Sequence, residues 1–280
     1  LQAGHRPSIL TRGYGCAAAP KGVTLVSDGE RVLAGLDLAG DEPLVLARQL
    51  PGVPVLVSRD RYEAGRLAET RLGCTVHVLD DGFQHFELER GVDLVLLSPE
   101  DVANPVTLPA GRLREPLDLV RAASAILVGE AGEDRARAIG RAVGVEEAFS
   151  LVRALDSARL LGTADARLAP GAGTRVLAVA GIARPERFFA SLEAAGWTVA
   201  GRMPFRDHHR FTRRDLARIA DAAGRAGAGL VLTTEKDAVR MEPLGPPPVR
   251  TAWVPLEATV EPADRFAAWL LQRLESGGRQ

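Results

Sequence analysis

Two adjacent carboxylates follow a short, largely apolar segment that has the composition of a buried strand. The segment is Thr75–Leu79, and Asp80, Asp81 and Gly82 come directly after it. In open α/β folds, ligands bind beyond the carboxyl ends of the strands, which is where both acids are expected. Mg²⁺ is commonly held by one or two carboxylates together with phosphate oxygens. The pair therefore indicates a metal–phosphate site, and a solvated turn after a strand is the alternative.

A second set of side chains suited to proton transfer is Asp41 and His208, which lie far apart in the sequence. Asp41 precedes Glu42 and Pro43 at the expected start of a helix, so it is a candidate general base or an ordinary helix cap. His208 follows Asp207, and a neighbouring carboxylate can orient an imidazole that holds or relays a proton. A solvated loop is the alternative for His208. Zinc is not predicted, because no cysteine pair or His-x₃-His spacing supplies four ligands.

Two arginine-containing segments are candidates for binding an anion. Arg12 ends the first expected strand, and Arg114 and Glu115 lie in a loop bounded by glycine and proline. A guanidinium group suits phosphate oxygens and a glutamate suits a metal, although an ordinary exposed loop is equally compatible with the second segment. Thr233–Asp237 ends a later strand, and no role is assigned to its Lys236.

These side chains need a layered framework, which recurring apolar runs predict. The runs in the first half are Ser8–Leu10, Val23–Val26, Val53–Val57, Thr75–Leu79, Asp93–Leu97 and Ala125–Val128. They are continuous rather than alternating, as in parallel strands that are buried on both faces. A helix is predicted between two of them, with Ser58 as its N-cap and Gly73 at its end. The alternation of strands and helices predicts a doubly wound α/β structure.

The same alternation restarts after a weakly periodic stretch, Val152–Gly173, which is typical of a linker or a small hairpin. The strands predicted beyond it are Val176–Ala180, Thr198–Ala200, Leu230–Thr233 and Trp253–Leu256. The predicted helices are Pro185–Ala195 and Arg213–Ala223. A capping box of Thr212 and Asp215 opens the second of these helices. The sequence therefore predicts two α/β lobes, residues 1–150 and 174–280, with a connector over 151–173 and a cleft between the lobes.

Composition excludes several classes of protein. The chain has 280 residues and a net charge of −1, so it has no basic excess to hold a nucleic-acid backbone. Two cysteines in this length fit a reducing compartment better than a disulfide framework. No apolar run approaches the ~20 residues of a membrane span, and no secretory signal is present. Neither G-x₄-G-K-[ST] nor G-x-G-x-x-G occurs, and the first residue is Leu, so we expect the chain to begin inside a longer reading frame.

Seven motifs in this order resemble the tetraacyldisaccharide 4′-kinases of lipid A synthesis, over about Ile9 to Arg240. They are Leu10–Gly15, Gly40–Pro43, Leu79–His85, Leu108–Pro116, Gly181–Phe189, Asp207–His208 and Thr234–Val239. The resemblance implies a P-loop-kinase-like lobe with a parallel sheet and a second, smaller α/β lobe, each of α/β/α layers. It implies transfer of the γ-phosphoryl group of ATP, with Mg²⁺, to the 4′-hydroxyl of a lipid A disaccharide 1-phosphate. It also implies peripheral contact with the cytoplasmic face of a bacterial inner membrane, with no nucleic acid and no obligate protein partner.

The resemblance also implies roles for residues at matching positions. Asp80 and Asp81 match the Walker B acids, which serve nucleotide and metal, and Glu115 matches a glutamate associated with Mg²⁺. Arg12 falls where an arginine near the phosphates is expected. Asp41 matches the proposed general base, and His208 matches the histidine that pairs with this base from the second lobe. The pair would then assemble only when the cleft closes and excludes water.

The sequence differs from the family pattern at its N-terminal end. A Walker A loop and a membrane-facing helix precede the Arg-Gly-Tyr strand in the family, and we expect both to lie upstream of residue 1. Because these parts stabilise the transferred phosphoryl group, residues 1–280 alone are expected to bind ATP poorly and turn over little. Two alternatives stay open: a two-lobed sugar-nucleotide-dependent glycosyltransferase, and a non-catalytic fragment that binds a phosphoglycolipid.

Overall fold

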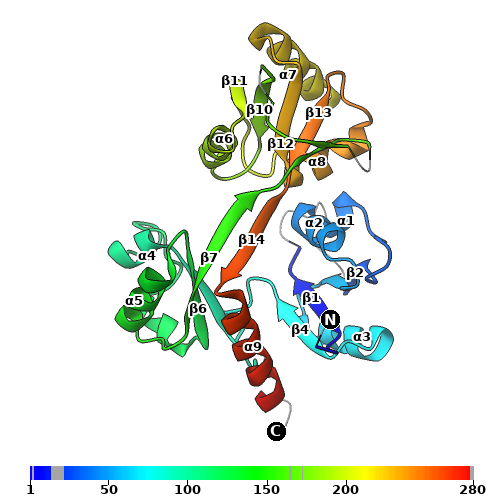
Figure 1. The fold of residues 1–280 in the computed structure, drawn as a ribbon. Coiled ribbons are helices and arrows are strands. Elements are labelled where there is room, and N and C mark those ends of the chain that lie inside the picture. Colours follow the sequence, from blue (N-terminus) through cyan, green and yellow to red (C-terminus); the bar gives the residue numbers. More distant parts are fainter. Residues whose placement is uncertain (2, 14–21, 164–165, 172, 278–280) are drawn as a thin grey trace. The chain divides into compact units, whose positions relative to one another are not determined.

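Three sheets, each with helices on both faces, make up the α/β structure of this chain (Figure 1). The computed structural model describes residues 1, 3–13, 22–163, 166–171 and 173–277. Contacts divide the chain into two compact units, one of Leu1–Asp80 with Leu155–Leu256 and the other of Asp81–Ala154 with Glu257–Gln280. The first unit thus draws on both predicted lobes, and the predicted boundaries at residues 150 and 174 stay a prediction. The predicted α/β class is confirmed: the sheets are mixed, and most of their strand pairs are parallel.

The first sheet has the strand order β2-β3-β1-β4, and only β2 runs antiparallel to its neighbour. Its elements are β1 (Pro7–Thr11), β2 (Thr24–Ser27), β3 (Val55–Val57), β4 (Val76–Leu79), α1 (Leu36–Ala39), α2 (Asp41–Gln49) and α3 (Arg61–Leu72). Successive side chains of a strand point to opposite faces. Val55 and Val57 therefore pack with Leu44 of α2, whereas Leu56 packs with Ala64 of α3.

The N-cap predicted for α3 is wrong by two residues. Asp60 is the N-cap, and its carboxylate accepts a hydrogen bond of 3.0 Å from the backbone N–H of Glu63. The hydroxyl of Ser58 instead accepts the N–H of Asp60 at 3.1 Å and so shapes the turn before the helix. Gly73 ends α3 as predicted, in the left-handed conformation with φ of 65°, which glycine adopts at little cost.

The second sheet also belongs to the first unit and has the order β11-β10-β12-β13-β8-β9. Its elements are β8 (Ala158–Leu160), β9 (Arg167–Leu168), β10 (Arg175–Ala180), β11 (Thr198–Pro204), β12 (Leu230–Thr234), β13 (Thr251–Val254), α6 (Pro185–Ala194), α7 (Arg213–Ala226), α8 (Glu235–Met241) and the 3₁₀ turn η2 (Glu242–Leu244). Phe189 of α6 packs on one face of the sheet and Ile219 of α7 on the other. The capping box of Thr212 and Asp215 is present, as predicted.

The third sheet forms the second unit and has the order β14-β7-β6-β5. Its elements are β5 (Leu94–Leu97), β6 (Ala125–Gly129), β7 (Ala148–Leu155), β14 (Leu256–Glu261), α4 (Pro99–Ala103), α5 (Glu133–Val143), α9 (Ala263–Gly277) and the 3₁₀ turn η1 (Leu117–Ala122). Phe149 of β7 contacts Phe266 and Trp269 of α9, with ring centroids 5.1 and 5.7 Å apart. The strand predicted over Trp253–Leu256 is in fact two, because Pro255 separates β13 from β14 and cannot donate to a ladder.

Two strands depart from the expected burial on both faces. β4 and β5 each lie at the end of their sheet, where Val78 is 52% exposed and Leu96 is 64% exposed. Their continuous apolar sequence resembles that of a central strand, but position in the sheet decides burial. The interior strands β3, β6 and β12 are buried along almost their whole length, as predicted.

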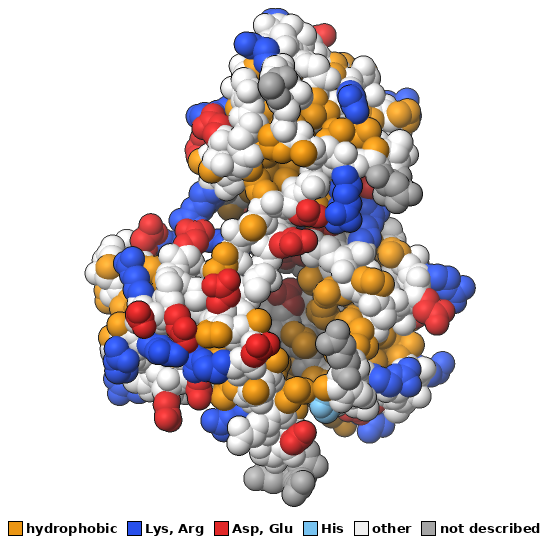
Figure 2. Space-filling model, in the orientation of Figure 1, with side chains coloured by type: hydrophobic (Ala, Val, Ile, Leu, Met, Phe, Trp, Pro, Cys, Tyr) orange, Lys and Arg blue, Asp and Glu red, His pale blue; other side chains and the backbone are white. Residues whose placement is uncertain are grey.

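Within the described residues, no helix has the length and apolarity needed to cross a membrane. On the face drawn in Figure 2, acidic and basic side chains are interspersed. This distribution agrees with the balanced charge of the sequence.

Candidate active site

Asp41 is the first residue of α2 and is almost completely buried. Gly40 precedes the helix with φ of 83°, a conformation that favours glycine and lets the chain turn sharply into α2. The Oδ1 atom of Asp41 accepts the backbone N–H of Glu42 at 2.9 Å. The residue is only 3% exposed. The capping alternative is wrong, because Gly40 is the N-cap of α2 and Asp41 is its first helical residue, and Asp41 has partners elsewhere in the chain.

The second oxygen of Asp41 meets two side chains from the other sheet of the same compact unit. Nη2 of Arg240, in α8, forms a short ion pair with Oδ2, and Nδ1 of His208 lies 3.2 Å from the same atom. His208 lies in the turn between β11 and α7, with φ of 52°. Its backbone N–H donates to Gly181 O at 3.2 Å and to Oδ1 of Asp207 at 3.0 Å. The structure therefore brings together Asp41 and His208, which are 167 residues apart.

Arg240 is held by a second buried carboxylate, Asp237, one turn earlier on α8. Oδ1 of Asp237 is 2.9 Å from Nη1 of Arg240, and Oδ2 accepts the N–H of Gly181 at 2.9 Å and the hydroxyl of Thr234 at 2.7 Å. Nη1 of Arg240 also donates to Gly181 O at 2.8 Å. A side chain at Gly181 would be crowded, because a Cβ there would lie 3.0 Å from the carboxylate of Asp237, which would have to shift.

Burial and charge act in opposite directions on these two acids. Burial alone would raise the pKa of Asp41, but the ion pair and hydrogen bond with Arg240, together with His208, outweigh it and lower the pKa. For Asp237 burial dominates and raises the pKa, despite the hydrogen bonds from Gly181 and Thr234 and the charge of Arg240. The guanidinium therefore stabilises the ionised form of Asp41 in particular.

Asp80 lies at the carboxyl end of β4, beside the end of β1. Its Oδ2 accepts the hydroxyl of Thr11 at 3.0 Å, and its backbone N–H continues the ladder to Leu10 O at 3.0 Å. Nη2 of Arg61 donates to its carbonyl at 3.4 Å. Arg12 follows β1 and is exposed. Asp80 thus occupies the predicted sheet edge, with one carboxylate oxygen oriented by a neighbouring strand.

Asp81 and Glu115 belong to the second compact unit. Nη1 of Arg114 lies 2.8 and 2.7 Å from the two carboxylate oxygens of Asp81, and both side chains are more than half exposed. Glu115 is half-buried. Among the described residues, no group of three or more His, Cys, Asp or Glu side chains is arranged to hold a metal ion. Of the Arg-Gly-Tyr motif, Tyr14 lies outside the described residues.

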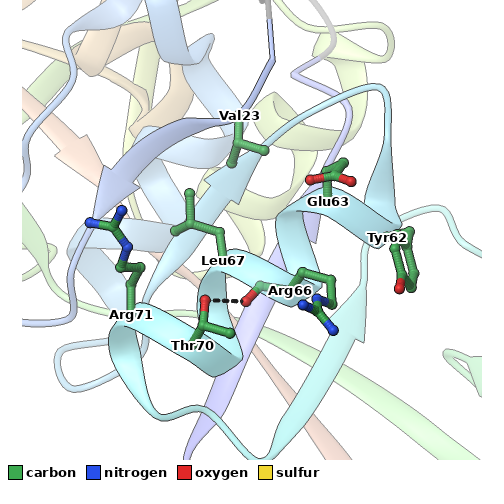
Figure 3. Close-up of a pocket in the computed structure, with 7 residues that line it drawn as sticks. All are labelled: Val23, Tyr62, Glu63, Arg66, Leu67, Thr70 and Arg71. Carbon is green, nitrogen blue, oxygen red and sulfur yellow. Dashed lines mark hydrogen bonds between the residues drawn. The ribbon is translucent and has the colours of Figure 1, made fainter.

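A depression of about 480 Å³ lies elsewhere, along α3 (Figure 3). Tyr62, Arg66 and Arg71 contribute to its lining, and the hydroxyl of Thr70 donates to Arg66 O at 2.7 Å. None of the site residues predicted from the sequence lines it.

Sequence reasoning missed Arg240 and Asp237 as members of the site. The sequence marks Thr233–Asp237 only as the end of a strand. The available signal was the spacing of three residues between Asp237 and Arg240, which places both on one face of a helix.

Comparisons with known proteins show which family this chain belongs to. A family profile described as "Tetraacyldisaccharide-1-P 4′-kinase" matches residues 1–275. A tetraacyldisaccharide 4′-kinase from Syntrophus aciditrophicus (strain SB) is 35% identical, over 98% of this chain and 77% of its own length. One from Anaeromyxobacter sp. (strain Fw109-5) is 44% identical, over 86% of this chain and 66% of its own length.

The crystal structure of the "apo" form of LpxK from Aquifex aeolicus in complex with ATP is similar to this fold. The TM-score is 0.75, the identity is 27%, and the match covers 98% of this chain and 80% of that one. The resemblance drawn from the seven motifs is thereby confirmed, whereas the expectation of an upstream phosphate-binding loop stays a prediction. The chain belongs to the tetraacyldisaccharide-1-P 4′-kinase family, the lipid kinases of lipid A biosynthesis.

Proposed function

We propose that the protein transfers the γ-phosphoryl group of ATP to the 4′-hydroxyl of a tetraacyldisaccharide 1-phosphate. Family membership sets the reaction class. The observation that carries the proposal for this chain is the contact of Asp41 with His208, 3.2 Å apart at the start of α2. A carboxylate joined to an imidazole is a general acid–base unit suited to accept the proton of an attacking hydroxyl. A group that accepts this proton is needed when an alcohol attacks a phosphoryl group.

Asp80 supports a magnesium site in this proposal. Mg²⁺ usually takes one or two carboxylates and completes its shell with phosphate oxygens and water, so a protein cage of three acids is not required. Asp80, at the carboxyl end of β4, fits that donor set, and Asp81 and Glu115 are the further candidates. When bound, the ion would neutralise charge on the phosphates. Arg12, exposed after β1, is proposed to approach the same phosphates.

The finer organisation is part of the same proposal. Residues 1–150 would form a P-loop-kinase-like core lobe, residues 151–173 the connector and residues 174–280 a second lobe, each built of α/β/α layers. The protein would work as a peripheral protein at the cytoplasmic face of the inner membrane, where an acylated disaccharide is found. The low turnover expected of residues 1–280 alone stays a prediction.

The test is a phosphoryl-transfer assay on the complete gene product. The protein is incubated with [γ-³²P]ATP, Mg²⁺ and tetraacyldisaccharide 1-phosphate in detergent micelles, and the product is located by mass spectrometry and ³¹P NMR. We expect one phosphate added at the 4′ position. Consumption of a sugar nucleotide without phosphate transfer would instead support the glycosyltransferase alternative. Tight binding of the lipid that does not depend on ATP, again without transfer, would support a binding role.

A further inference from the structure

Exposed arginines gather at one edge of the second sheet, within the first compact unit. They lie in or next to two turns, one between β10 and α6 and the other between β11 and α7. The residues, here called the arginine surface, are Arg184, Arg187, Arg206, Arg210, Arg213 and Arg214. All of them are exposed, and none has a side-chain hydrogen bond or ion pair within the part of the chain that the structure describes.

The two turns are adjacent because the strands before them are neighbours. β10 and β11 are parallel, and Ala180 at the end of one strand is in register with Pro204 at the end of the other (Figure 1). The N–H of Phe205 donates to Ala180 O at 2.8 Å, and a Cβ at Gly181 would lie 3.4 Å from Arg206 O. The arginines of both turns therefore belong to the same carboxyl edge of one sheet.

Buried side chains hold the second turn in place. Phe211 is only 6% exposed, and the centroid of its ring lies 5.0 Å from that of Phe205 and 4.9 Å from that of His209. Thr212 and Asp215 form the capping box that begins α7 immediately afterwards. Packing and capping thus fix the backbone that carries the exposed arginines of this turn.

The arginine surface has a local excess of positive charge. The exposed acids in these turns are Glu186 and Asp207, so six arginines against two carboxylates leave a net charge of +4, whereas the whole chain has a net charge of −1. Asp215 does not reduce this excess, because it is buried in the cap and has its own partner in Arg218 at 3.3 Å. The positive charge is therefore concentrated here and is not a property of the composition.

Several of these arginines are placed unfavourably for the helices that follow them. Arg184 is the N-cap of α6 and makes no side-chain capping bond, and Arg213 and Arg214 are the first two residues of α7. A cation at a helix N-terminus meets the positive end of the helix dipole, where acidic residues are favoured. The arginines therefore do not stabilise these helices, and an anionic partner explains their placement.

A phospholipid surface is the anionic partner that fits best. Proteins that hold single-stranded nucleic acid usually combine a basic groove with aromatic rings on which bases stack. Here Phe188, Phe189 and Phe211 are buried, and no large apolar side chain is exposed over residues 181–218, all of which the structure describes. Contact with the partner would therefore be electrostatic, without insertion of apolar groups. Anionic lipids attract clustered arginines in this way.

We propose that the arginine surface docks on the anionic phospholipids of the bilayer that holds the acceptor. The inference rests on the proposed kinase function, because four acyl chains keep such an acceptor in a bilayer. His208 lies in the same turn as Arg206 and Arg210. Docking thus brings this turn to the level of the lipid headgroups, where the disaccharide lies. This contact is separate from the helix expected upstream of residue 1.

The test is binding of the complete gene product to sucrose-loaded vesicles, measured by sedimentation. Vesicles of phosphatidylethanolamine and phosphatidylglycerol are compared with vesicles of phosphatidylcholine alone. The triple variant Arg210→Gln, Arg213→Gln and Arg214→Gln removes half of the arginine surface. Each arginine near an anionic membrane strengthens binding by about fivefold, so this variant should bind the anionic vesicles roughly 10²-fold less tightly. Its binding to phosphatidylcholine vesicles should stay the same.

A matched control removes the same charge from the second compact unit. Arg121, Arg135 and Arg141 are also exposed, and they have no ion pair among the described residues. Replacing all three with glutamine should change binding to the anionic vesicles by less than about threefold at about 0.1 M salt, because charges beyond a Debye length of the bilayer are screened. Equal losses in the two triple variants would mean unspecific attraction and would overturn the proposal.

A second measurement needs no variant. Hydrogen exchange of the wild-type protein is followed by mass spectrometry with and without the anionic vesicles. Peptides that cover residues 205–214 should exchange more slowly with the vesicles, and about 1 M salt should reverse this protection. The absence of protection over these residues would overturn the proposal, even if the triple variant failed to fold.

Other anions are tested on the same proteins. The affinities of the wild type and of the arginine-surface variant for MgATP and for a single-stranded oligonucleotide are measured by calorimetry, and each should differ by less than about threefold. A loss for either anion that exceeds the loss for the vesicles would mean that the arginines bind nucleotide phosphates or nucleic acid. That outcome would overturn docking on a bilayer.

Failure of the docking surface is distinguishable from failure of the proposed function, because vesicle binding needs no turnover. If the wild-type protein binds anionic vesicles through these arginines but adds no phosphate to the acceptor, the kinase function fails. If it adds the phosphate, but the arginine-surface variant binds the vesicles as tightly as the wild type does, only the docking surface fails.

Discussion

Removing the buried guanidinium should destabilise the first compact unit far more than removing an exposed cation on the same helix. Arg240→Met leaves the carboxylates of Asp41 and Asp237 without their common cation, and these residues are 3% and 0% exposed. Loss of one partner of a buried ion pair costs about 3–5 kcal/mol, because the remaining charge is desolvated and uncompensated. At about 2–4 °C per kcal/mol for a unit of this size, the midpoint of thermal unfolding should fall by roughly 6–20 °C.

Lys236→Met is the matched control for this prediction. Lys236 is also on α8 and pairs with Glu42, the residue next to Asp41, but the two side chains are 38% and 35% exposed. An ion pair of this kind is worth about 0–1 kcal/mol. Urea and thermal unfolding of both variants at pH 7 would measure the difference. Equal losses of unfolding free energy in the two variants would refute the argument that burial decides how much the ion pairs of Arg240 stabilise the fold.

Three further predictions concern single residues. Folding lowers the pKa of Asp41, so the ionised carboxylate stabilises the fold at any pH above its unfolded pKa of about 4, and this stabilisation is lost as the pH falls through the lower pKa of the folded state. The difference in unfolding free energy between wild type and Asp41→Asn, measured by urea titration, should therefore shrink below about pH 4. Thr212→Ala removes the capping box of α7 and should cost about 1 kcal/mol in the same assay, whereas Thr212→Ser should be nearly neutral. Asp80→Asn should weaken Mg²⁺-dependent nucleotide binding by about 10- to 100-fold in calorimetry, and an unchanged affinity would remove Asp80 from the proposed metal site.

Local sequence signals predicted most strands of the first two sheets, and the family motifs pointed to Asp41 and His208 but not to Arg240. Continuous apolar runs marked the interior strands, and turn and cap residues marked several helix ends, including Gly73 and the Thr212 capping box. These signals work because strand burial and capping are decided within a few residues. They failed for β4 and β5, whose sequences are those of interior strands although their place in the sheets leaves Val78 and Leu96 exposed.

The parts that escaped prediction depend on contacts between distant segments. The aromatic cluster of Phe149, Phe266 and Trp269 joins β7 to α9, more than 110 residues later, and nothing local to either segment reports that pairing. Arg240 is 199 residues from Asp41, and it is one arginine in an arginine-rich chain. Among the described arginines only Arg61 and Arg240 are buried, and the type of residue alone does not reveal which arginines these are. Asp41 comes from the first predicted lobe and His208 from the second, but both residues belong to one compact unit of the structure.

Contacts with α2 explain the polar residues in the segment from Thr234 to Arg240. Three polar pairs connect α8 to α2 in order of increasing burial: Lys236 with Glu42, Glu235 with Gln49 at 2.5 Å, and Arg240 with Asp41. The exposed pair can add little energy, but it favours one register of the two helices. The buried pair is the costly one to break, because each of its charges depends on the other. The outer pairs favour one register of α8 on α2, and that register sets the position of Asp41 relative to Arg240 and His208.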